Sequence, residues 1–174
     1  MATSSPNLIQ QFYEKIDELV APYFQEYKPY LKCQKGCTEC CTDETGFQIR
    51  RIEADEILRA FQALPKQEQV LIQNNLKQAE ANNNLEKMPC PMLIDNACSI
   101  YAHRPTICRV FGLLIDLRSQ KGCCKLNFND VPKDVTLNTV GLDPVYDLLN
   151  ELNEAIDPTD ERKKISQWLN QLLD

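Results

Sequence analysis

The chain has 174 residues, of which 43% are apolar, and a formal net charge of −6. The composition is typical of a globular protein rather than a disordered one, and the length suits a single domain over residues 1–174. Nucleic-acid affinity depends on Lys and Arg contacts to phosphate, so an acidic chain is expected to have no nucleic-acid partner.

The N-terminal residues lack the basic start, apolar stretch and cleavage site of a secretory signal. No stretch approaches the roughly 20 apolar residues of a membrane-spanning helix. We therefore expect a cytoplasmic protein with no membrane partner. Thiols stay reduced in the cytoplasm, so clustered cysteines there indicate metal ligands or redox groups rather than disulfides.

Helical periodicity dominates the first half of the chain. Apolar residues spaced by three and four predict an amphipathic helix over residues 5–29. Similar patterns predict a helix over 52–64, stopped near Pro65, and another over 66–81. A short strand is expected at 46–49, after a cysteine-rich loop.

The second half alternates short strands and helices. Residues 92–101 resemble two short strands around an Asp-Asn turn. Pro105 suits the first turn of a helix that runs to about Phe111. Residues 113–142 are irregular with short strands, and helices are expected from Pro144 and from Pro158. The fold class that follows is mostly α: one domain with a cysteine-rich metal-binding centre, a short β-hairpin and flanking packing helices.

Cysteine spacing is the most informative feature of the chain. Four of the nine cysteines lie within nine positions, and three more follow a long gap before a final adjacent pair. Thiolates brought together at short spacings suit zinc or iron, whereas packing alone does not require so many. The candidate metal ligands are all nine: Cys33, Cys37, Cys40, Cys41, Cys90, Cys98, Cys108, Cys123 and Cys124.

The adjacent cysteines limit how the ligands are shared. Cys33, Cys37 and Cys40 can share a helix face or converge in a loop. Neighbours such as Cys40 and Cys41 point apart, so either they serve different metals or one of each pair is a packed residue. Two four-cysteine sites with one cysteine left over, one site with extras, and a binuclear cluster all remain open.

For other side chains near the cysteines, the sequence indicates a role at the metal site less clearly. Arg104, if helical, lies one turn before Cys108 and can neutralise a thiolate site, or it pairs with a carboxylate or caps backbone carbonyls. For Arg109 the structural role, a carboxylate pair or a cap on backbone carbonyls, is favoured. The only histidine, His103, is a generic metal ligand but is more typical of a surface or capping group. Tyr101 is expected in the core or a strand.

Taken together, the motifs resemble the YkgJ-type cysteine-cluster family, a zinc- or iron-chelating domain. The family pattern is Cys-x2-Cys-x2-Cys-Cys, then Cys-Pro-x-Leu, then Cys-x-Ile-Tyr-x-x-Arg-Pro-x-x-Cys-Arg. Here the later part is carried by Cys90, Pro91, Leu93, Cys98, Ile100, Tyr101, Arg104, Pro105, Cys108 and Arg109. The first part departs from the pattern, because three residues rather than two separate Cys33 from Cys37. The resemblance covers about residues 30–125 and implies a metal-binding core there.

Two classes of function fit these features. The first is a metal-binding protein with a thiolate-rich site, zinc being the first choice, that acts as a structural, regulatory or metal-handling module with a protein partner. The alternative is an iron–sulfur redox protein working with an electron-transfer partner. A catalytic zinc site fits less well, because all-thiolate ligation is a poor basis for hydrolysis. No small-molecule substrate is identifiable.

Overall fold

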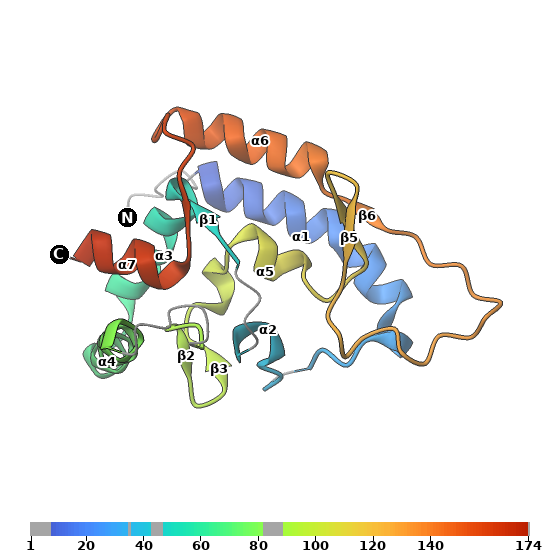
Figure 1. Cartoon of the computed structure of the whole chain (residues 1–174), viewed down its shortest axis with the longest axis horizontal. Helices are drawn as coiled ribbons and strands as arrows, with labels where there is room; N and C mark the ends of the chain where they lie inside the picture. Colours follow the sequence, from blue (N-terminus) through green and yellow to red (C-terminus); the bar gives the residue numbers. More distant parts are fainter. Residues whose placement is uncertain (1–7, 35, 43–46, 82–88, 174) are drawn as a thin grey trace, which may run out of the picture. The chain divides into compact units, whose positions relative to one another are not determined.

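The structure is a computed structural model that describes residues 8–34, 36–42, 47–81 and 89–173. Helices dominate it, which confirms the predicted mostly α class (Figure 1). The chain groups into two compact units, each built from two stretches of sequence. The first unit holds Met1–Cys33 and Thr106–Leu152, and the second holds Gln34–Pro105 and Asn153–Asp174. The single domain over 1–174 stays a prediction.

In the first unit, helix α5 packs against the long helix α1. The bounds of its helices are α1 Leu8–Glu26, the 3-10 helix η1 Lys28–Tyr30, α5 Thr106–Val110 and α6 Asp143–Glu154. Helix α1 buries one stripe at helical spacing: Ile9, Phe12, Tyr13, Ile16 and Val20. It ends three residues before the predicted end at residue 29, and positions 5–7 lie outside the described residues.

A small sheet completes the first unit. Strand β4 (Ile115–Leu117) lies between antiparallel β5 (Gln120–Gly122) and parallel β6 (Val140–Gly141). The β4–β5 turn is tight because Arg118 and Ser119 both take positive φ, 53° and 63°, which matches the twist of a two-residue hairpin. These strands confirm the short strands expected in residues 113–142.

In the second unit, three helices surround a hydrophobic core. They are α3 Arg51–Ala63, α4 Lys66–Ala81 and α7 Ile165–Leu173. Helix α7 packs against both α3 and α4, and its Trp168 is 1% exposed. The Trp168 indole N–H donates to the carbonyl of Ile49 across 3.0 Å. The core cluster contains Ile49, Ala54, Ile57, Ala60, Phe61, Ile72, Leu76, Met92, Ile100, Trp168 and Leu169.

Two antiparallel strand pairs also belong to the second unit. Strand β2 (Leu93–Ile94) pairs with β3 (Ala97–Cys98). The Asp95-Asn96 turn between them takes positive φ at both residues, 48° and 59°, so the predicted hairpin is confirmed, with shorter strands. Strand β1 (Ile49–Arg50) pairs with β7 (Arg162–Lys163). Strand β1 overlaps the predicted strand 46–49 only at Ile49, and Gly46 lies outside the described residues.

Two local predictions were wrong. The last helix begins at Ile165, not at Pro158, because the Asp157 carboxylate accepts hydrogen bonds from the backbone N–H and hydroxyl of Thr159 at 3.0 and 2.6 Å. This turn competes with helix formation. The loop carrying the first cysteines contains a short helix, α2 (Glu39–Thr42). Within the described residues, no helix is both long and apolar enough to cross a membrane.

Candidate metal centre

The two units divide the nine cysteines between them. All nine lie within the described residues and carry thiols rather than disulfides. The first unit contains Cys33, Cys108, Cys123 and Cys124. The second contains Cys37, Cys40, Cys41, Cys90 and Cys98. The sequence run that begins at Cys33 is therefore shared, its first cysteine ending one unit and the other three belonging to the next.

Backbone hydrogen bonds bring both halves of the cysteine pattern together in the second unit. Helix α2 carries Cys40 and Cys41, and the backbone N–H of Cys90 donates to the Cys41 carbonyl across 2.7 Å. The carbonyl of Cys90 accepts from the N–H of Leu93 at 3.0 Å. Leu93 is the strand partner of Cys98 across the β2–β3 hairpin. These links place Cys40, Cys41, Cys90 and Cys98 in one neighbourhood, here called the thiol cluster.

Electrostatics show that the thiols of this cluster affect one another. The hydrogen bond from the Cys41 side chain lowers the pKa of Cys40 to about 7, against the opposing effect of burial. The positive charge of Arg104 acts in the same lowering direction. A thiol with this pKa is substantially ionised near neutral pH, and the thiolate is the form that binds metals.

The pKa values of Cys90 and Cys98 are raised, whereas that of Cys40 is lowered. Burial, together with the smaller effect of the negative charges of Cys98 and Cys40, raises the pKa of Cys90 to about 12, against the lowering effect of the Met92 backbone. Burial likewise raises the pKa of Cys98, partly offset by Arg104. Both side chains pack against the core of the second unit. A cation placed among them would reverse this effect, because metal coordination favours the thiolate.

Arg104 reaches the thiol cluster from an extended segment, not from a helix. It follows the 3-10 helix η2 (Tyr101–His103), and α5 starts only at Thr106, so the predicted one-turn relation to Cys108 is wrong. The guanidinium donates to the Tyr101 carbonyl at 2.9 Å and lies 4.1 Å from the centre of its ring. Tyr101 itself is 63% exposed, contrary to the expected core position.

The other two polar residues near the motif have structural partners. On α5, Arg109 Nη1 lies 2.5 Å from Asp17 Oδ2, and this carboxylate pair is one of the two structural roles expected for it. Its guanidinium stacks 4.2 Å from the Tyr13 ring. His103 Nδ1 lies 2.8 Å from Glu56, a carboxylate that is 0% exposed and also pairs with Arg59. His103 is thus a half-exposed imidazole oriented by a buried carboxylate.

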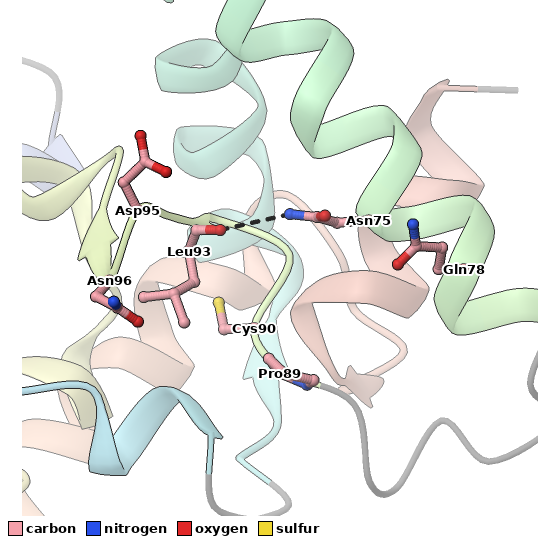
Figure 2. Close-up of a pocket in the computed structure, with 7 residues that line it drawn as sticks. All are labelled: Asn75, Gln78, Pro89, Cys90, Leu93, Asp95 and Asn96. Atoms are coloured by element: carbon pink, nitrogen blue, oxygen red, sulfur yellow. Dashed lines mark hydrogen bonds between the residues drawn. The ribbon is translucent and has the colours of Figure 1, made fainter.

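A cavity of about 300 Å³ lies beside Cys90 (Figure 2). It is lined by Asn75 and Gln78 of α4, the Pro89–Cys90 segment, Leu93, and the hairpin residues Asp95 and Asn96. Asn75 donates to the carbonyls of Pro91 and Leu93 at 3.1 and 3.4 Å, which fixes the segment that carries Cys90. The cavity therefore gives one member of the thiol cluster a route to solvent.

In the first unit, the best-defined cysteine environment is that of Cys33. Its Sγ accepts a hydrogen bond from the side-chain amide of Asn127 at 3.3 Å. Burial raises the pKa of Cys123, and the adjacent Cys124 acts in the same direction. Cys124 is 4% exposed and belongs to the core, which agrees with the alternative that one member of an adjacent pair is a packed residue. Cys108 lies on α5 and is partly buried.

The side chains are near one another but do not form a closed chelate. Within the described ranges, no three Cys, His, Asp or Glu side chains converge well enough to hold a metal ion. The donor chemistry nevertheless fits zinc or iron, because four thiols share one neighbourhood with an arginine that offsets their charge.

Three features of the site carry no signal in the sequence. Glu56 is 47 positions from His103, and Asn127 is 94 positions from Cys33. The cavity joins a helix face to a hairpin turn. Each depends on long-range packing, and an isolated Glu or Asn in a polar stretch has no spacing pattern that reveals its partner.

Comparison with known proteins supports the cysteine pattern. A family model, CxxCxxCC, described as "putative zinc- or iron-chelating domain", matches residues 32–130, more than half of the chain. Searches of the curated proteins and of the solved structures gave no significant match. The matched range contains all nine cysteines. The chain therefore belongs to the CxxCxxCC family of zinc- or iron-chelating domains.

Proposed function

We propose that the chain binds zinc or iron through the thiol cluster, and that metal binding completes the local structure around it. The observation that carries this proposal is the 2.7 Å hydrogen bond from Cys90 to Cys41, which joins the two halves of the cysteine pattern. Arg104 adds a positive charge that favours thiolates at Cys40 and Cys98. The candidate ligands are Cys40, Cys41, Cys90 and Cys98. The adjacent pair Cys40 and Cys41 was expected to point apart, but the two side chains are joined by a hydrogen bond.

Metal binding at these residues is expected to be coupled to a conformational change. The thiols are near one another but not in chelating positions. Closing the site would require the cysteine side chains to rotate and α2 to approach the β2–β3 hairpin. Binding free energy then contributes directly to the stability of the second unit, as in other thiolate metal domains.

Zinc is the first choice of metal, with a structural, regulatory or metal-handling role. Zinc has no redox chemistry and accepts four thiolates in a tetrahedral site. All-thiolate ligation leaves no open position for water, so the proposal includes no hydrolytic step. A protein partner and a cytoplasmic location fit this role, because the nine thiols need a reducing environment to remain ligands.

An iron–sulfur cluster is the second candidate. Four cysteines in one neighbourhood equal the number that hold a typical cluster. Arg104 near two of them also supplies positive charge, one of the features that set the potential of such a centre. The role would then be electron transfer or redox sensing with a partner protein.

Anaerobic purification followed by metal analysis and visible spectroscopy tests the proposal. Zinc bound to a colourless protein supports the first role, and iron with sulfide and broad visible absorption supports the second. Chelation should lower the melting temperature of the metal-bound protein in either case. A chain that takes up neither metal, even after anaerobic reconstitution, would contradict both roles.

A further inference from the structure

A second cavity, of about 400 Å³, lies where α3 packs against η2 in the second unit. Helix α3 and its C-cap contribute Arg59, Ala60, Ala63 and Leu64 to the lining, and residues 99–103 contribute the rest. None of the candidate metal ligands lines it. The volume is within the range of small-molecule binding sites, so the cavity is large enough for a ligand of its own.

Most of the lining is apolar. Ala60 and Ile100 are its most buried residues, at 6% and 3% exposure. Ala63, Leu64 and Ala102 add further aliphatic side chains, and the small alanines leave the space open. An apolar lining with a few polar groups is typical of sites that bind small organic molecules.

The two basic side chains of the lining share one buried carboxylate. Glu56 lies one turn before Arg59 on α3, and its side chain is 0% exposed. Its Oε1 lies 2.8 Å from His103 Nδ1, and its Oε2 pairs with Arg59 Nη1. A buried carboxylate is costly without such partners, so the pairs hold both basic side chains at the cavity.

Both basic side chains keep hydrogen-bonding groups for a ligand. His103 uses Nδ1 for Glu56, and the described residues offer its Nε2 no other partner. The guanidinium of Arg59 has five N–H donors, and its pair with Glu56 is made through Nη1. The side chains of His103 and Arg59 are 38% and 55% exposed, so solutes can reach both.

The charges at the cavity favour a ligand with one negative charge. Glu56 offsets one of the two basic groups, so the three side chains carry one net positive charge when His103 is protonated. A monoanion would balance this charge, whereas a phosphate dianion would exceed it. The next residue, Arg104, acts instead on the thiols of Cys40 and Cys98.

Hydrogen bonds fix the segment that faces α3. The N–H of His103 donates to the carbonyl of Ile100 at 2.8 Å. The backbone N–H and the hydroxyl of Ser99 both donate to the carbonyl of Met92 at 2.9 Å. A site whose groups are already in place loses less conformational freedom when a ligand binds.

We propose that this cavity binds a small organic monocarboxylate. Arg59 and His103 hold the carboxylate of the ligand through charge-assisted hydrogen bonds, and the apolar lining receives its hydrocarbon part. Glu56 is a positioning residue, because it orients both basic side chains without lining the cavity. This binding site is separate from the thiol cluster and adds a ligand class to the proposed metal-binding function.

A titration of zinc-loaded wild-type protein with benzoate, followed by 1H–15N NMR, tests the proposal without any variant. Saturable shifts are expected at the amides of residues 59–64 and 99–103. Benzyl alcohol, which has the ring without the charge, and inorganic phosphate should bind at least about tenfold more weakly. Shifts that do not saturate or lie elsewhere, or equal affinity for benzyl alcohol or phosphate, would overturn the proposal.

Two variants test the assigned roles. Arg59→Gln and His103→Gln each keep a polar partner for Glu56 but remove a cation, so each should weaken benzoate binding at least about tenfold. The matched control is Arg51→Gln, because Arg51 is on the same helix, pairs with Asp55 and does not line the cavity. It should leave benzoate affinity unchanged.

Zinc affinity of the same proteins separates this site from the thiol cluster. Arg59→Gln should bind zinc as wild type does, because Arg59 touches no candidate ligand. Benzoate affinity that is unchanged in both Arg59→Gln and His103→Gln would overturn the proposal, since the carboxylate would then bind elsewhere, for example on the metal. That result would leave the proposed metal binding intact.

Discussion

The backbone N–H of Cys90 donates to the carbonyl of Cys41 across 2.7 Å. This bond joins two cysteine motifs that are 49 positions apart in the sequence. It also gives the four-residue helix α2 a tertiary contact, and short helices need such contacts because their own hydrogen bonds do not sustain them. The metal site proposed for the thiol cluster would depend on this connection, because it brings Cys40 and Cys41 to the hairpin that carries Cys98.

Thiol reactivity should differ sharply within the thiol cluster of metal-free protein. Cys40, with a pKa of about 7, is about half ionised at neutral pH, whereas Cys90, with a pKa of about 12, is ionised to only about one part in 10⁵. Alkylation of Cys40 should therefore rise as the pH passes through 7, while Cys90 stays unreactive to about pH 10. Mass spectrometry after timed labelling measures both rates.

The matched control for this labelling is Cys41→Ala. The hydrogen bond from Cys41 is the largest cause of the lowered pKa of Cys40. Its removal should raise the pKa of Cys40 and move the reactivity midpoint to higher pH. Faster labelling of Cys90 than of Cys40 at pH 7 would refute the assigned environments.

Arg104 should act on the cluster through its charge. Arg104→Gln removes a charge that lowers the pKa of both Cys40 and Cys98, so both pKa values should rise and zinc binding at neutral pH should weaken. Arg104→Lys keeps the charge but loses the planar contact with Tyr101. Labelling of Cys40 against pH should therefore shift more for Gln than for Lys. Equal shifts for the two variants would show that the planar contact of Arg104 with Tyr101, rather than its charge, lowers the pKa of Cys40.

Arg109 should contribute to stability and not to metal binding. Its side chain is 3% exposed and pairs with Asp17, which is 46% exposed. Arg109→Met should lower the free energy of unfolding by about 1–3 kcal/mol, towards the low end because Asp17 can be solvated. Zinc affinity, measured well below the melting temperature, should not change.

The exposed pair of Arg118 and Asp147 in the same unit provides the comparison for Arg109. Arg118→Met should cost about 0–1 kcal/mol, as is usual for surface ion pairs. Urea unfolding followed by circular dichroism measures both variants. A tenfold loss of zinc affinity in Arg109→Met would show that this arginine acts at a metal site after all.

Trp168 should stabilise the second unit and report its unfolding. It is the only tryptophan, it is 1% exposed, and its N–H bonds to Ile49. Trp168→Phe should cost about 1–3 kcal/mol through lost packing and an unpaired Ile49 carbonyl. Tyr101→Phe, at a 63% exposed aromatic, should change stability by no more than about 0.5 kcal/mol. Equal melting temperatures for the two variants would contradict this difference.

The longer helices and the hairpin could be predicted from sequence because their signals are local. The stripe on α1 and the stop of α3 before Pro65 follow from side-chain periodicity and from the restriction that proline imposes on Leu64. Helix α2 and the pairing of β1 with β7 could not be predicted in this way. Helix α2 has four residues, too few to show a periodic pattern. The pairing of β1 with β7 depends on hydrogen bonds between segments that are distant in the sequence.

The sequence was enough to predict which residue types form the candidate site, but not which of these residues lie together. The spacing of the cysteines indicates metal binding without showing that Cys33 and Cys40 belong to different units. The expected core position of Tyr101 was wrong because its ring stacks on Arg104 at the surface. The hydrogen bond from Asn127 to Cys33 could not be anticipated, since the two residues lie 94 positions apart.

The metal content of a double variant shows whether the thiol cluster is the metal site. Wild type, Cys90→Ala/Cys98→Ala and the control Cys123→Ala are purified anaerobically side by side, and zinc and iron are measured per chain. Metal binding by the thiol cluster predicts about one zinc ion, or one iron–sulfur cluster, in wild type and in the control, and a loss of at least about tenfold in the double variant. A double variant that folds and retains the wild-type metal content would contradict the account.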